Sequence, residues 1–234
     1  NKTFNEFLSE YLTFAADTAS VINDCLRSAV SIYTEFVETT SGFFGQQSGV
    51  AISSGSGVVL DVADNYAYIA TNYHVVYDTK ADTTKNGGTK FARKIVCYLY
   101  GSESYPSQVD RDGNGKADTD ENGYYIYDYD EKYALSAELV GGSAEADIAV
   151  LRVNRSDIDK IGGSVKAAEF ADYYRVGQKA IAIGNPESEG ISVTEGIVSV
   201  DNENIVLSVD GTKRYHRSMR IDTAIYHGSS GGGL

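Results

Sequence analysis

Apolar residues recur with two different periods along the chain. Between residues 3 and 24 they fall three or four positions apart, which is typical of one face of an α-helix. Thr3 followed by Glu6 is the capping-box pair that opens such a helix. From residue 26 onward the period is two, which is typical of half-buried strands. The pattern therefore predicts an N-terminal helix within residues 1–25, packed on its own domain, followed by a β-rich body.

The β-rich body consists of short apolar segments separated by turn residues. The expected strands are residues 29–36, 57–62, 66–70, 94–100, 124–129, 147–153, 178–183, 191–200, 205–209 and 219–221. A loop rich in Gly, Ser and Gln is expected over residues 39–49. Many short strands of this kind indicate an all-β sandwich or barrels. The polar stretch 154–174 has no strand signal, so it is the expected linker between two β units.

Size and charge exclude several classes of protein. A chain of 234 residues fits one large β domain or two ordinary ones. Its net charge of −13 argues against partners such as nucleic acid or anionic membranes, which require a basic face. No run of 18 apolar residues is present, so the sequence predicts no membrane-spanning helix. Cys25 and Cys97 form either one disulfide or two buried thiols, and we favour the thiols.

Three short segments contain a histidine, an aspartate and a serine in an order known from nucleophilic catalysis. His74 follows one expected strand, Asp147 opens another, and Ser230 lies in a glycine-rich segment near the end. A serine hydroxyl is a weak nucleophile until a base removes its proton, and a neutral imidazole suits that task. A buried carboxylate would hold the imidazole in the required tautomer. The sequence therefore predicts His74 as base, Asp147 as its orienting partner and Ser230 as nucleophile.

Glycines around the serine predict an oxyanion hole. The backbone N–H groups of Gly228 and Ser230 would stabilise the oxygen anion of a tetrahedral intermediate, and a side chain at 228 would restrict the backbone. Ser229 is the other candidate nucleophile. Only Ser230 lies in the pattern Gly-x-Ser-Gly-Gly, and we therefore prefer it.

An acidic segment near residues 101–131 separates two expected strands. It has 9 acidic and 2 basic residues. Within it, residues 110–121 match the EF-hand Ca²⁺ loop, with Gly115 at the sharp turn. The predicted ligands are Asp110, Asp112, Asn114, Asp118 and Glu121, with the backbone carbonyl of Lys116. The flanks are Tyr-rich and not helical, so the alternative is a solvated acidic hairpin tip.

Several motifs together give the chain a resemblance to a known family. They are residues 55–59 (GSGVV), 71–76 (TNYHVV), 147–151 (DIAVL), 176–186, 193–199 and 222–232. With these motifs the chain resembles the protease domain of the HtrA (Deg) family of trypsin-like serine endopeptidases. The resemblance covers about residues 26–234 and implies two perpendicular six-stranded barrels with the site in the cleft between them. It also implies cleavage of unfolded or damaged polypeptides, no cofactor in the chemistry, a following PDZ domain and assembly as a homo-oligomeric trimer.

The resemblance also assigns domains and substrate contacts. The expected divisions are the helix 1–25, a first barrel 26–160 containing the acidic insertion, and a second barrel 161–234. Ile225 matches the position that lines the primary specificity pocket, which suggests cleavage after small aliphatic residues. His227 stands beside the oxyanion glycine as a further substrate contact. The family pattern continues beyond Leu234, so we expect an incomplete second barrel, a longer natural chain and an inactive isolated piece.

The function predicted from these features is serine endopeptidase activity outside the cytoplasm. The expected location is the cell envelope or the exterior, with anchoring through a segment absent from this sequence. Two alternatives stay open. One is a non-catalytic trypsin-like module that binds polypeptides, and the other is a secreted trypsin-like protease with a narrow substrate.

Overall fold

The computed structural model describes residues 3–42 and 45–234, and strands dominate it. The helical elements are α1 (Phe4–Leu26), α2 (Tyr73–Val76), α3 (Arg155–Lys160) and the 3₁₀ turn η1 (Pro186–Ser188). The strands are β1 (Ala29–Gly42), β2 (Gly45–Val62), β3 (Tyr66–Thr71), β4 (Lys94–Leu99), β5 (Ser107–Gln108), β6 (Tyr127–Asp128), β7 (Leu135–Ser143), β8 (Ile148–Asn154), β9 (Lys179–Gly184), β10 (Ser192–Ser208) and β11 (Lys213–Ile221). The predicted all-β class is confirmed.

The first unit is a closed barrel of six antiparallel strands in the order β1-β2-β3-β8-β7-β4. Alternate side chains of β3 are buried, as a period of two requires. Ile32, Val59, Leu135 and Leu151 fill the interior and are at most 1% exposed. This barrel therefore holds the main apolar core of the chain.

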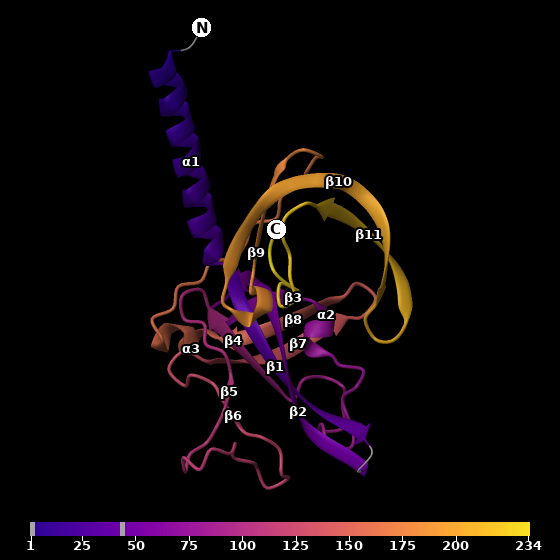
Figure 1. Cartoon of the computed structure of the whole chain (residues 1–234). Coiled ribbons are helices and arrows are strands. Elements are labelled where there is room, and N and C mark those ends of the chain that lie inside the picture. The colour runs from indigo at the N-terminus through magenta and orange to yellow at the C-terminus, as the bar shows by residue number, and fades with distance from the viewer. Residues whose placement is uncertain (1–2, 43–44) are drawn as a thin grey trace.

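The second unit is an open three-stranded sheet in the order β11-β10-β9, so the second barrel is incomplete. Figure 1 shows β10 and β11 as a long curved hairpin above the first barrel. The prediction of two strands at 191–200 and 205–209 is wrong, because β10 runs through without a break. The polar segment that suggested a turn instead produces register shifts against β11 between Val198 and Glu203. Such shifts bend a strand without ending it.

Two further strand predictions need correction. The expected loop at 39–49 is wrong, since β1 and β2 pair as far as Gly42 and Gly45. The Tyr-rich strand expected at 124–129 is reduced to β6. Before it the Asp120 carboxylate accepts the backbone N–H groups of Asn122 and Tyr124, and after this turn Tyr125 forms an isolated bridge with Thr119 instead of a continuous strand.

Helix α1 begins at the predicted capping box, in which Thr3 and Glu6 cap each other. Its N-terminal end projects beyond the two sheets (Figure 1), and among the described side chains those of its last turns pack on the domain, as predicted. There Leu26 is buried and Ile22 partly buried in a small cluster with Ile183. The side chains of residues 7–17 lie outside what the structure describes. Among the described residues no helix is long and apolar enough to cross a membrane.

Both cysteines are free thiols. Cys97 is buried, as predicted, and burial raises the pKa of its thiol to about 12. The prediction of burial is wrong for Cys25, which lies exposed near the end of α1. Between β8 and β9 the chain forms α3 and then irregular structure, in the region predicted as a linker. The domain boundaries themselves stay a prediction.

Candidate active site

His74 lies on α2, the single helical turn that follows β3. Asn72 precedes this turn as its N-cap, and Val75 and Val76 anchor it in the barrel core. Because the two valines point inward, the His74 side chain stays near the surface, with 44% of it exposed. The core therefore fixes the turn while leaving the imidazole accessible.

Asp147 lies immediately before β8 and meets His74 across the barrel rim. His74 Nδ1 is 2.9 Å from Asp147 Oδ2 and 3.1 Å from Oδ1. The His74 backbone N–H also donates to Oδ1 at 3.1 Å, and Asn72 Nδ2 donates to the Asp147 carbonyl at 2.8 Å. The Asp147 side chain is only 8% exposed, and its φ of 53° lies in the left-handed region, which Asp tolerates better than most residues. The arrangement occupies Nδ1 and leaves Nε2 as the ring nitrogen available for proton transfer.

Ser230 lies in a tight turn after β11. The Ser229 N–H donates to the Tyr226 carbonyl at 3.1 Å, and the Gly232 N–H donates to the Ser229 carbonyl at 2.9 Å. Within the described ranges the backbone N–H groups of Gly228 and Ser230 have no hydrogen-bond acceptor. They are thus available to an incoming oxygen, as an oxyanion hole requires.

Gly228 requires glycine for two reasons. Its φ is +91°, a conformation that other residues rarely adopt. A Cβ at this position would lie 2.3 Å from the carbonyl oxygen of Asn185. The backbone geometry of the predicted oxyanion segment therefore depends on the absence of a side chain.

The turn that contains Ser230 and the turn that contains His74 both approach Gly55 of β2. A Cβ on Gly55 would lie 2.7 Å from the Val75 side chain and 3.3 Å from the Ser230 carbonyl oxygen. In the part of the chain that the structure describes, no hydrogen bond joins Ser230 Oγ to the His74 ring. The structure therefore brings the two turns together at Gly55 but does not pair the Ser230 hydroxyl with His74.

The two predicted substrate contacts occupy different surroundings. Ile225 is 55% exposed and lines a cavity of about 250 Å³ between the turn that contains Ser230 and the sheet β9–β11. Ile183, Met219 and Ile221 contribute to the same lining, so the cavity is mainly apolar. His227 is exposed and does not line it, but its carbonyl accepts the Glu187 N–H at 2.6 Å. Of the two predicted substrate contacts, Ile225 therefore lies at the cavity and His227 lies outside its lining.

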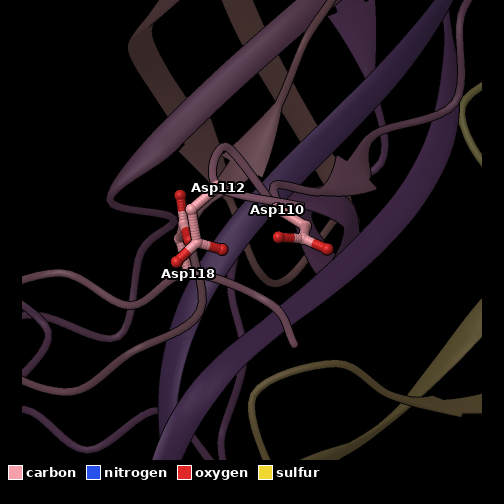
Figure 2. Close-up of side chains that lie close together, drawn as sticks. All are labelled: Asp110, Asp112 and Asp118. Carbon is pink, nitrogen blue, oxygen red and sulfur yellow. The ribbon is translucent and has the colours of Figure 1, made fainter. Parts of the chain in front are cut away.

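The acidic insertion brings together three of the predicted calcium ligands. Asp110, Asp112 and Asp118 each place a carboxylate oxygen within 4.8 Å of the other two (Figure 2). The backbone N–H of Asn114 donates to Asp110 Oδ1 at 3.2 Å and to Asp112 Oδ1 at 3.1 Å. These bonds hold Asp110 and Asp112 on the inside of the turn.

The remaining predicted ligands differ in placement. Asn114 Oδ1 accepts the backbone N–H of Lys116, so both residues belong to the same turn. The Glu121 carboxylate is not in the group of three. A turn built on Asp120 folds the chain back so that Thr119 pairs with Tyr125, and no helix follows the loop as in an EF-hand.

A buried carboxylate attaches this insertion to the first barrel. Glu35 of β1 is 6% exposed and pairs with Arg93 at 3.2 Å and Lys94 at 3.7 Å. It also accepts the Tyr129 hydroxyl at 2.8 Å. Burial, together with the Glu35 charge, raises the pKa of Tyr129, so the hydroxyl keeps its proton and remains a donor.

The sequence interpretation assigned no role to Ser56, which the structure places against the turn that contains Gly228 and Ser230. Its hydroxyl lies 2.8 Å from the Gly228 carbonyl oxygen, and its backbone N–H donates to the Ser230 carbonyl at 2.7 Å. The only sequence signal was its position between two glycines, Gly55 and Gly57, which indicates close approach of another backbone.

Comparison with known proteins agrees with this geometry. Residues 55–234 match the family model of the trypsin-like peptidase domain. The chain is 29% identical over 239 residues to the serine protease Do-like HtrB of Bacillus subtilis (strain 168), covering 98% of this chain and 41% of that protein. It is 26% identical to the serine protease Do-like HtrA of the same strain, over 94% of this chain and again 41% of the relative. The chain thus spans about two fifths of the length of these relatives.

Solved structures show the same fold. The HtrA-type protease AlgW, as a serine-to-alanine variant with a decapeptide, aligns with a TM-score of 0.56 and 23% identity over 92% of this chain and 53% of its own. Deg5 aligns with a TM-score of 0.52 and 22% identity over 92% of this chain and 77% of its own. Together with the family match, these similarities confirm the predicted resemblance. The chain belongs to the trypsin-like peptidase family, and its similarity within that family is to serine proteases of the HtrA type.

Proposed function

We propose that this chain is the catalytic domain of a serine endopeptidase that hydrolyses peptide bonds with His74, Asp147 and Ser230. The observation that supports this most directly is the position of His74 Nδ1, 2.9 Å from the buried Asp147 carboxylate. A histidine held in this way presents a basic Nε2 at the surface, close to the turn that contains Ser230. Neither a purely structural histidine nor a polypeptide-binding module requires this arrangement.

In the proposed mechanism each residue has one task. His74 Nε2 takes the proton of Ser230 Oγ as the hydroxyl attacks the scissile carbonyl carbon, and later gives it to the leaving amine. Asp147 accepts the His74 Nδ1–H and stabilises the imidazolium. The free N–H groups of Gly228 and Ser230 donate to the developing oxyanion. No step requires a cofactor.

The preferred substrate is an unfolded polypeptide with a small aliphatic residue before the cleaved bond. Ile225 and the apolar lining of the adjacent cavity support this preference, because a basic side chain there would find no carboxylate among the described lining residues. The names of the relatives support action on polypeptides, since they are called serine proteases and endoproteases. Action on damaged proteins and assembly as a trimer stay predictions from the resemblance.

The proposed location is outside the cytoplasm. A relative from Bartonella henselae, 36% identical over 46% of this chain, is named a probable periplasmic serine endoprotease. A relative from Rhizobium meliloti, 35% identical over 42% of the chain, has the same name. Membrane anchoring stays a prediction.

Labelling with a fluorophosphonate probe tests the proposed function. The natural gene product should be labelled once per chain, and tandem mass spectrometry of the labelled peptide should locate the modification on Ser230 because His74 activates that hydroxyl alone. Heat-denatured protein serves as the control and should remain unlabelled. Absence of labelling would favour the polypeptide-binding module, and labelling of Ser229 would contradict the assignment of the nucleophile.

We propose a second function, Ca²⁺ binding, for the loop of residues 110–121. Three carboxylates within 4.8 Å of one another support it, because like charges so close repel one another unless a cation lies between them. Arg111 lies 3.9 Å from Asp118 and offsets one of the three charges, which leaves a net negative charge for a bound cation. Asp110, Asp112 and Asp118 would supply carboxylate oxygens, with Asn114 and the Lys116 carbonyl completing the set. Glu121 would have to move to join them.

Titration calorimetry with Ca²⁺ checks this proposal. Chelator-treated natural gene product is expected to bind one Ca²⁺ with a Kd on the order of 10⁻⁴ M, in the range of extracellular sites. The double variant D110N/D112N should bind at least about tenfold more weakly, since each substitution removes a charge from the set. D128N, which changes an exposed aspartate of the same insertion outside the group, is the matched control. The absence of binding heat at millimolar Ca²⁺, or equal affinities in all three proteins, would refute the site.

A further inference from the structure

Ser56 is a buried polar residue at the contact between the two β units. It lies on β2 of the closed barrel, is 1% exposed, and has glycines on both sides. Because its neighbours lack side chains, backbone from the second unit can approach it closely. The proposed mechanism gives Ser56 no role.

The Ser56 hydroxyl joins two segments of the second unit. It lies 2.8 Å from the Gly228 carbonyl oxygen and 2.7 Å from the Asn185 backbone nitrogen. A carbonyl can only accept and an amide N–H can only donate, so the hydroxyl donates to Gly228 and accepts from Asn185. The hydroxyl proton therefore points at the Gly228 carbonyl, and this hydrogen bond holds the Gly228–Ser229 peptide in place.

The Ser56 backbone holds the other end of the same segment. Its N–H donates to the Ser230 carbonyl at 2.7 Å. Its carbonyl accepts the Thr71 hydroxyl at 2.7 Å, which ties Ser56 to the strand that precedes the His74 turn. A Cβ on Gly231 would lie 2.3 Å from both of these oxygens, so the turn is in close contact with this position. One residue of the first barrel thus fixes the carbonyls of Gly228 and Ser230.

The carbonyls of Gly228 and Ser230 lie at the two ends of segment 228–230. Within this segment the N–H groups of Gly228 and Ser230 are free, whereas the Ser229 N–H donates to Tyr226. Gly228 and Ser230 are the proposed oxyanion donors, and Gly228 has no side chain to restrict its backbone at φ +91°. The orientation of the Gly228 backbone must then come from hydrogen bonds to neighbouring groups. Catalysis by such donors depends on their being oriented before the charge develops.

We propose that Ser56 is a positioning residue for the oxyanion hole, whose hydroxyl orients the Gly228–Ser229 peptide so that segment 228–230 directs its free N–H groups to the substrate oxygen. This rests on the proposed serine endopeptidase function. Ser56 does not touch the substrate. It acts through the backbone of the nucleophile turn.

The variant S56A tests this role in the natural gene product. It removes the hydroxyl but keeps the N–H that bonds to Ser230. The kcat per titrated active site is expected to fall about 10- to 100-fold, less than the 10²- to 10³-fold that loss of a donor costs. KM for a peptide p-nitroanilide should change less than about threefold, since ground-state contacts remain. Affinity for a peptide boronic acid should fall as much as kcat, because its adduct places an oxygen in the oxyanion hole.

Two further variants separate positioning from general destabilisation. S53A removes an exposed hydroxyl from the same strand and should leave kcat unchanged. S56C keeps a group of similar size with a weak S–H donor, so its kcat should lie between wild type and S56A, and it serves alone if S56A does not fold.

The outcomes distinguish this inference from the proposed function. An active wild type whose kcat per site differs from that of S56A by less than about twofold overturns the inference alone. A decrease explained entirely by fewer titratable sites and a lower Tm also overturns it. A wild type without any titratable serine overturns the proposed function and the inference together.

Discussion

Replacing Ser230 by alanine is expected to lower kcat for peptide hydrolysis by about 10⁶-fold, the size of effect that follows loss of a serine nucleophile in an intact triad. The alanine lacks the oxygen that forms the acyl intermediate, while Gly228 and the apolar cavity still bind the substrate. KM should therefore change little. Steady-state hydrolysis of a peptide p-nitroanilide by the natural gene product gives both constants.

Ser229 provides the matched control for this result. Its N–H and its carbonyl stabilise the turn through Tyr226 and Gly232, and both bonds survive in S229A because they involve only the backbone. Its hydroxyl makes no hydrogen bond within the described part of the chain. S229A should therefore retain activity within about tenfold of wild type. Residual kcat in S230A above about one tenth of wild type would assign the nucleophile elsewhere.

The second large effect is expected for D147N, which should lower kcat by about 10⁴-fold at neutral pH. The His74 backbone N–H donates to Asp147 Oδ1, so the carboxamide oxygen of an asparagine would take that place. Its NH₂ group would then face His74 Nδ1 and force that nitrogen to accept. The proton would move to Nε2, which could no longer act as the base.

Asparagine is also the informative choice on structural grounds. Asn tolerates a φ of 53°, whereas most other replacements would add backbone strain to the loss of charge. D61N is the control, because this exposed carboxylate also accepts a backbone N–H, from Val62 at 2.9 Å. Its activity should equal that of wild type, and Tm measurements on both variants report folding. A loss in D147N smaller than about tenfold would contradict the orienting role of Asp147.

Features that depend on neighbouring residues were accessible from the sequence. The capping box of Thr3 and Glu6 spans four residues and is present as predicted. The hairpin of β2 and β3 follows from alternating apolar positions around a short turn. His74, Asp147 and Ser230 each lie in a short motif, so a few neighbouring residues are enough to single out each of them.

Features that depend on distant contacts were not accessible. The segment that separates the two predicted halves of β10 looks like a turn, but pairing with β11 continues through it. The apolar face of α1 indicated packing on the domain, and among the described side chains Ile22 and Leu26 of its last turns pack against Ile183. In β10 tertiary pairing therefore outweighed the local preference of the chain for a turn.

The sequence by itself determined the all-β class, the N-terminal helix and the three residues of the proposed triad, because local periodicity and short motifs specify them. Only the tertiary structure decided the contacts of Ser56, whose hydroxyl bonds to Asn185 and Gly228 across 129 and 172 residues of chain. Only it decided that Asp110, Asp112 and Asp118 converge while Glu121 does not. Hydrogen bonds between such distant positions depend on how the strands pair and how the two β units pack, and no local pattern records them.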